Sequence, residues 1–123
     1  MVPGQAHAED GALREFLEPL RAKAGEWQAL TLAIGKRAMG DADEIGAAAY
    51  DYLFYSGYMA LAYWWARSVA AADASSQPQA FKDAKRETAR FYFARILPRT
   101  LAHKAAIDSG AASLMAMDAD RFD

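Results

Sequence analysis

The stretch from Tyr50 to Arg67, YDYLFYSGYMALAYWWAR, constrains the fold of this chain more than any other feature. It carries no charge between Asp51 and Arg67, contains no proline and holds eight aromatic residues. In a helix, its apolar side chains fall on every face, so the helix is either buried on most sides or lies in a membrane. The uncharged run is shorter than the roughly 18 residues that suggest a membrane span. We therefore predict the central helix of a bundle, with no membrane span.

The composition indicates one folded, all-α domain. The chain has 123 residues, of which 54% are hydrophobic and 24% charged, as is usual for a globular domain. Alanine dominates and the strand formers Val, Ile and Thr are scarce, which favours helices over strands. The net charge is −2, with Lys and Arg spread along the chain, which argues against a nucleic-acid partner. Cysteine is absent, and the N-terminus has no readable signal peptide, so we expect a cytoplasmic protein.

Helical periodicity divides the chain into a lead-in and one domain. Residues 1–8 are expected to be a flexible lead-in, because Pro3 and Gly4 interrupt any regular pattern there. Residues 9–123 are expected to form a single helical-bundle domain. Apolar residues recur at three- and four-residue steps from about Glu9 until Gly40. Pro19 lies inside this pattern and either kinks the helix or starts a second one.

Two further long helices are expected. One runs from about residue 42 to about residue 72, with Asp41 as its N-cap and Glu44 completing a capping box. The other starts near Gln79, is kinked at Pro98 and ends or breaks at Gly110. A short helical turn follows over residues 113–117. The predicted fold is an antiparallel bundle of three long helices plus a short C-terminal helix, similar to a four-helix bundle.

No motif for catalysis or metal binding is readable. The two histidines, His7 and His103, are not preceded by a Glu three residues earlier, as a di-metal bundle would require. No phosphate loop, nucleophile elbow or Cys/His pair is present. We therefore expect no catalytic residue and no metal ligand. Asp51 is expected to form a buried ion pair with Arg90 or Arg95. The alternative is that arginines of this kind clamp a ligand's carboxylate or phosphate group.

The aromatic segment has two interpretations of equal weight. Its rings form either the core of the bundle or the seam of a homodimer, where Tyr and Trp are enriched. The residues expected to contact a partner or a ligand are these: Tyr55, Tyr58, Trp64, Trp65, Arg67 and Arg95.

Two longer segments carry a resemblance to a known family. They are YDYLFYSGYMALAYWWARSVAAA and KRETARFYFARILPRTLAHKAAIDSGAASLMAMDADRF. Together they resemble the C-terminal helical extension of acyl-CoA dehydrogenases, in the acetyl-CoA dehydrogenase-like or methylmercaptopropionyl-CoA dehydrogenase branch. The residues that fit the family pattern are Gly57, Leu61, Ala62, Trp65, Phe91, Tyr92, Phe93, Leu97, Pro98, Gly110, Leu114, Met115 and Phe122. The resemblance covers nearly the whole chain from about Leu13, and its motifs are packing motifs.

The resemblance implies a fold and an association. The parent family consists of FAD-dependent oxidoreductases of fatty acid metabolism. Its flavin-binding segments, acyl-CoA pocket and catalytic glutamate lie upstream of the extension. The resemblance therefore implies no catalytic residue and no cofactor in this chain, and it implies a flavin-binding dehydrogenase core as a partner.

Three functional hypotheses follow. In the first, which we favour, the chain is a non-catalytic bundle that packs on a dehydrogenase core or self-associates as a homodimer. In the second, it binds a small apolar ligand such as an acyl chain in an aromatic cleft rimmed by Arg67 or Arg95. In the third, its amphipathic helices lie on a membrane surface, although the mixed charges of the third helix fit anionic lipid poorly.

Overall fold

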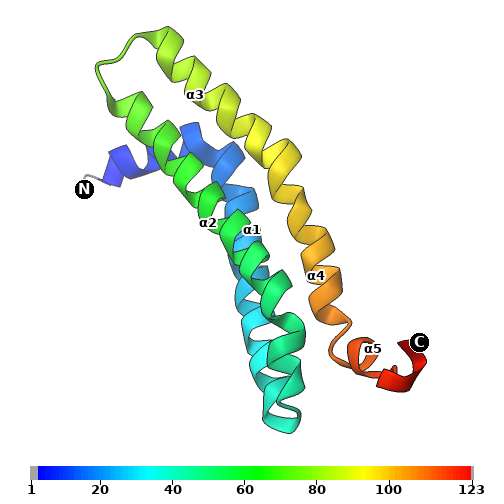
Figure 1. The fold of residues 1–123 in the computed structure, drawn as a ribbon. Coiled ribbons are helices and arrows are strands. Elements are labelled where there is room, and N and C mark those ends of the chain that lie inside the picture. Colours follow the sequence, from blue (N-terminus) through cyan, green and yellow to red (C-terminus); the bar gives the residue numbers. More distant parts are fainter. Residues whose placement is uncertain (1–2, 123) are drawn as a thin grey trace.

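The computed structural model describes residues 3–122, with side chains from residue 11 onward. Its elements are α1 (Pro3–Gly40), α2 (Asp43–Ala74), α3 (Gln79–Phe91), the π-helical turn η1 (Tyr92–Ile96), the 3-10 turn η2 (Leu97–Arg99), α4 (Thr100–Asp108), α5 (Ala112–Met115) and the 3-10 turn η3 (Ala119–Phe122). No strand occurs among these residues. Figure 1 shows α1 and α2 as a long hairpin, with α3 and α4 returning along α2. The expected all-α bundle is confirmed.

The first helix is longer than expected and contains its proline. It begins at Pro3 instead of near Glu9, and Pro19 lies inside it. Residues 1–2 of the expected lead-in lie outside the described residues, and the flexibility of residues 1–8 stays a prediction. Pro19 lacks the N–H group that would bond to the carbonyl of Glu15. Figure 1 shows the first turns of α1 running crosswise to the rest of the helix, as expected of a helix that a proline kinks.

One face of α2 packs against the rest of the bundle. Its buried residues include Ala48, Tyr55, Ala62 and Val69, which recur every seven residues. Three of these four are small or medium-sized, which allows α1 and α4 to approach α2 closely. The core along this face consists of three clusters, one with Phe16 of α1 at one end, one with Ala62 in the middle and one with Ile107 of α4 at the other end.

The third expected helix is interrupted where Pro98 predicted a kink. α3 gives way to η1 and η2 before α4 begins at Thr100. The pyrrolidine ring of Pro98 leaves the carbonyl of Ala94 without its usual helical donor. A π-helical turn widens the helix by about one residue and so rotates everything after it. This rotation decides which side chains of α4 face α2.

The expected capping box is wrong, and Glu44 has another role. The N–H of Asp43 bonds to the carboxylate of Asp41 over 3.0 Å. Glu44 Oε2 instead accepts the N–H of Ala111 over 3.1 Å, because the end of α4 lies beside the start of α2. Gly110 makes this approach possible, since its φ is 70° and a Cβ there would lie 3.3 Å from Glu44 Oε1.

Arg37 of α1 closes the same end of the bundle. Its Nη1 donates a hydrogen bond to the carbonyl of Ile107 over 2.9 Å. That carbonyl belongs to the last turn of α4, whose C=O groups lack intrahelical N–H donors, and it also accepts the N–H of Gly110 over 3.1 Å. α4 is therefore held to both other long helices at its C-terminal end. Beyond it, α5 and η3 project away from the bundle (Figure 1).

Candidate functional site

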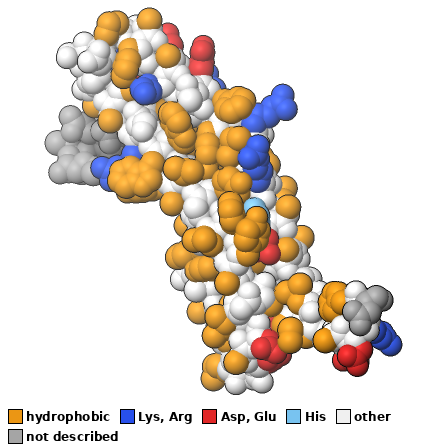
Figure 2. Space-filling view, viewed as in Figure 1, with side chains coloured by type: hydrophobic (Ala, Val, Ile, Leu, Met, Phe, Trp, Pro, Cys, Tyr) orange, Lys and Arg blue, Asp and Glu red, His pale blue; other side chains and the backbone are white. Residues whose placement is uncertain are grey.

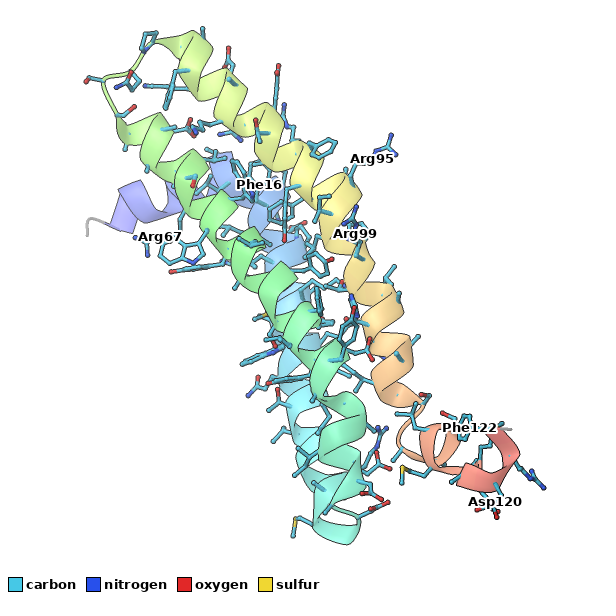
Figure 3. All side chains as sticks on the ribbon, viewed as in Figure 1. Phe16, Arg67, Arg95, Arg99, Asp120 and Phe122 are labelled. Atoms are coloured by element: carbon cyan, nitrogen blue, oxygen red, sulfur yellow. The ribbon has the colours of Figure 1, made fainter. Side chains whose placement is uncertain are left out.

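The six expected contact residues do not form one site. Tyr55 is fully buried, and its hydroxyl donates a hydrogen bond to Glu26 of α1 over 2.6 Å. Trp64 is 58% exposed. Figure 3 shows Arg67 and Arg95 pointing outward on opposite sides of the bundle. The remaining two, Tyr58 and Trp65, are half-buried against the core.

The aromatic segment is therefore divided between core and surface. Burial raises the pKa of the Tyr55 phenol, and the neighbouring Glu26 carboxylate raises it further. Exposed side chains are contributed by Tyr50, Phe54, Tyr63 and Trp64. The seven-residue repeat of Ala48, Tyr55, Ala62 and Val69 is the sequence signal that could have separated the two groups.

Asp51 does not pair with Arg90 or Arg95. Its carboxylate lies 2.8 Å from Nδ1 of His103 on α4, and both side chains are largely buried. The π-helical turn η1 rotates α4 relative to α3, which brings His103 toward α2. Phe54 stacks on the His103 ring at a centroid distance of 5.5 Å. The expected ion pair is corrected to an aspartate–histidine hydrogen bond.

Arg90 instead joins α3 to α1. Its guanidinium donates two hydrogen bonds to Glu15, of 2.5 and 2.9 Å. The hydrogen bond from Arg90 holds the pKa of the Glu15 carboxyl below its usual range. Arg86 adds a further link between helices by binding Asp73 over 2.7 Å. These charges therefore pair with each other across the helices.

The outer face of α2 lies opposite the buried Tyr55 and is apolar and largely exposed among the described residues, with the Tyr50 ring at its edge 6.2 Å from the His103 ring of α4. We define it as Gly46, Ala49, Tyr50, Leu53, Gly57, Ala60, Leu61 and Trp64. Its four large side chains are between 51% and 68% exposed. Asp51 is the one charged residue between Glu44 and Arg67, and it is turned toward His103. Figure 2 shows hydrophobic side chains along α2 with few charged groups among them.

Two hollows border this outer face. The larger, of about 670 Å³, lies between α1 and α2. It is lined by Thr31, Ile34, Gly35, Ile45, Ala48, Ala49, Tyr52, Leu53 and Ser56. The smaller, of about 370 Å³, is lined by Leu53, Phe54, Gly57, Tyr58 and Leu61. Leu53 therefore stands as a ridge between two depressions.

The polar groups of the larger hollow already have partners. The hydroxyl groups of Thr31 and Tyr52 lie 2.7 Å apart, and Ser56 accepts a hydrogen bond from Trp27 Nε1 over 2.7 Å. No arginine or lysine lines the larger hollow. Arg67 lines a separate apolar hollow of about 120 Å³ between α1 and α2, together with Leu13, Leu17, Leu20, Tyr63, Ala66 and Ala70. Among the side chains of residues 11–122, no three His, Asp or Glu groups are gathered to hold a metal ion.

Arg67 lies at the C-terminal end of the outer face. The guanidinium carbon of Arg67 lies 5.8 Å from the ring centroids of both Tyr63 and Trp64. Arg67 Nη1 also donates a hydrogen bond to the Tyr63 hydroxyl over 3.0 Å. Cation–π contacts of this kind hold an exposed arginine in place.

None of the helices described here is both long enough and apolar enough to cross a membrane.

Comparison with known proteins gives one match. The family model described as "Acetyl-CoA dehydrogenase C-terminal like" matches residues 4–118. The match therefore covers all the long helices and the turns at the Pro98 break. No curated protein and no solved structure matches the chain.

Proposed function

The chain belongs to the acetyl-CoA dehydrogenase C-terminal-like family, and we propose that it is a non-catalytic bundle that serves packing and oligomerisation in an acyl-CoA dehydrogenase-like flavoprotein. The partner is a flavin-binding dehydrogenase core or a second copy of the chain. The description of the matching family also favours the acetyl-CoA dehydrogenase-like branch.

The observation that carries this proposal is the outer face of α2. Leu53, Trp64 and Tyr50 are each more than half exposed, and no charge interrupts the face. A monomeric protein rarely leaves a contiguous apolar surface of this kind in water, and such surfaces mark interaction sites. Aromatic residues that are exposed in the isolated chain but covered in a complex are typical of the centre of an interface.

The polar side chains of the bundle support a structural role. Asp51 binds His103, Glu15 binds Arg90, and Glu26 binds Tyr55. Each pair joins two different helices, so each hydrogen bond positions one helix on another. A catalytic acid or base needs a free atom directed at a substrate pocket. None of these paired residues lines either of the two hollows.

The lining of the larger hollow is poorly suited to the flavin of the parent family. A pyrophosphate group needs backbone N–H groups at a helix N-terminus or cationic side chains. The larger hollow offers neither a lysine nor an arginine, and its hydroxyl groups are used within the bundle. We therefore assign flavin binding to the dehydrogenase core and none to this chain.

The solution mass of the chain tests this function. Light scattering is carried out on the chain alone and with a flavin-loaded acyl-CoA dehydrogenase core supplied in trans. The proposal expects a dimer of the chain or a complex that elutes with the core. A monomer that ignores the core at every concentration contradicts it.

A second function is favoured by the volume of the larger hollow. At about 670 Å³, it lies within the range of small-molecule sites, roughly 300–1,000 Å³. Its apolar lining suits an acyl chain, and the missing arginine means that no charged head group is held. Titration with a fluorescent medium-chain fatty acid tests it. Saturable binding that Gly35→Leu abolishes supports this function, and unsaturable partitioning contradicts it.

A further inference from the structure

We propose that the outer face of α2 binds the same face of a second copy of this chain, in an antiparallel two-fold arrangement centred at the level of Tyr55. This proposal rests on the packing function above and gives it one partner and one register. A two-fold axis makes each contact occur twice, because a residue that contacts another is contacted by it in return.

The sizes of the exposed side chains match under this symmetry. The axis exchanges residues that lie equally far before and after Tyr55. Leu53 and Gly57 lie two positions before and after it, so each Leu53 is placed against the Gly57 of the other copy. A Cβ at Gly57 would meet nothing within 4 Å, and the smaller hollow lies at this glycine. The ridge of one copy therefore has a depression to fill in the other.

The same match recurs along the face. Tyr50 and Ala60 lie five positions on either side of Tyr55, and Gly46 and Trp64 lie nine positions on either side. Tyr50 is 64% exposed and Trp64 is 58% exposed, whereas a Cβ at Gly46 would meet nothing within 4 Å. In every pair, a large exposed side chain is placed opposite a small residue, as knobs-into-holes packing requires.

Charges at the two ends favour the same arrangement. Asp43 and Arg67 lie twelve positions before and after Tyr55, and both are exposed. Antiparallel pairing brings the Arg67 of each copy to the Asp43 of the other. Parallel pairing would instead place Arg67 against Arg67 and Trp64 against Trp64. Charge complementarity at the rim of an interface selects orientation in this way.

The first experiment fills the depression. Sedimentation equilibrium of the full chain is expected to show a dimer that Gly57→Leu weakens by at least about tenfold. The Cβ has open space in the monomer and leucine is a better helix former than glycine, so the melting temperature should not fall at concentrations where the parent chain is monomeric. Gly25→Leu is the matched control, because Gly25 of α1 is also helical and open. It is expected to leave the dimer unchanged.

Charge exchange and cross-linking test the register. Asp43→Lys and Arg67→Glu are each expected to weaken the dimer, and the double variant to restore it. The chain has no cysteine, so introduced cysteines report contacts unambiguously. A mixture of Tyr50→Cys and Ala60→Cys chains should form disulfide-linked heterodimers. Either variant alone should not, because like positions lie about 15 Å apart in the antiparallel pair, too far for a disulfide.

Three results overturn this proposal. If Gly57→Leu leaves the dimer intact, the two copies contact each other through another face. The proposed packing function would then remain, but the antiparallel pairing proposed here would be rejected. A monomer that elutes with the dehydrogenase core rejects the second copy as partner and also leaves the packing function standing. A monomer that ignores the core rejects both.

Discussion

The hydroxyl group of Tyr55 on α2 donates a hydrogen bond of 2.6 Å to the carboxylate of Glu26 on α1. The tyrosine side chain is fully buried, and the same hydroxyl lies 3.3 Å from the carbonyl of Lys23. This contact fixes the rotation of α2 against α1. It therefore decides which residues of α2 remain on the outer face.

Removing this hydroxyl should destabilise the bundle. Tyr55→Phe keeps the ring and deletes the hydrogen bond to Glu26, which is worth about 1–2 kcal/mol because one partner is charged and half-buried. The free energy of unfolding from urea titration measures the loss. Tyr63→Phe is the control, since its exposed hydroxyl accepts a hydrogen bond from the exposed Arg67, and it is expected to change stability by less than about 0.5 kcal/mol. Equal losses in the two variants would contradict the account.

Alkaline pH should unfold the bundle through its buried tyrosines. Burial raises the pKa of Tyr92 to about 12, and burial and Glu26 raise that of Tyr55. A phenol with a raised pKa stabilises the folded state below its unfolded pKa of about 10. That stabilisation is lost as the pH rises from 10 toward 12. Thermal melts across this range should show a falling midpoint, less steep in Tyr92→Phe. A flat profile would contradict the burial of both rings.

Acid should weaken the link between α1 and α3. Arg90 holds the pKa of Glu15 below its usual value, mainly through the hydrogen bond between them. A carboxylate with a lowered pKa stabilises the folded state above its unfolded pKa of about 4.3. This contribution is lost as the pH falls through the lowered value. Glu15→Gln should therefore show a smaller fall in melting temperature between pH 5 and pH 3 than the parent chain. Parallel curves would exclude this pair as an acid-sensitive contact.

The turn at Gly110 should tolerate no side chain. Gly110→Ala places a Cβ at a φ of 70° and 3.3 Å from Glu44 Oε1, which should cost about 1–2 kcal/mol in strain. It also displaces the carboxylate that accepts the N–H of Ala111. Gly25→Ala, in an open helical position, should instead stabilise the chain by about 0.5–1 kcal/mol. Opposite signs in the two unfolding experiments are expected, and a neutral Gly110→Ala would be inconsistent with the structure.

Most of the architecture could be predicted from local sequence patterns. The sequence predicts the aromatic helix at about residues 42–72, and the helix is observed at Asp43–Ala74, because its ends are set by polar and small residues nearby. The kink at Pro98 was predicted from the chemistry of proline alone. The exact form of this break, a π-helical turn followed by a 3-10 turn, has no comparable local signal.

The partners of the polar side chains could not be predicted in the same way. The pairing of Asp51 with His103 depends on the rotation that η1 imposes on α4. The contact of Glu44 with Ala111 depends on where α4 ends. Both arise from tertiary packing between segments more than fifty residues apart. The charged residues are therefore evident from the sequence, but their partners differ from those that the sequence predicts.

Only part of the interaction surface could be predicted from the sequence. The sequence indicated that the aromatic helix holds more apolar surface than the bundle covers, and the structure places that surplus on Tyr50, Leu53 and Trp64. The six expected contact residues are all aromatic or cationic. The small residues of the outer face, Gly46 and Gly57, carry no such character. Their importance follows from their position opposite large side chains.

The most direct test of the central claim is hydroxyl-radical footprinting of the outer face of α2. Trp64 and Tyr50 are more than half exposed in the isolated chain, so they should be oxidised readily at low concentration. At high concentration, or with the dehydrogenase core present, their oxidation should fall several-fold, while that of the exposed Met39 on α1 stays constant. Unchanged oxidation of Trp64 and Tyr50 under all three conditions would show that nothing covers this face and would contradict the account.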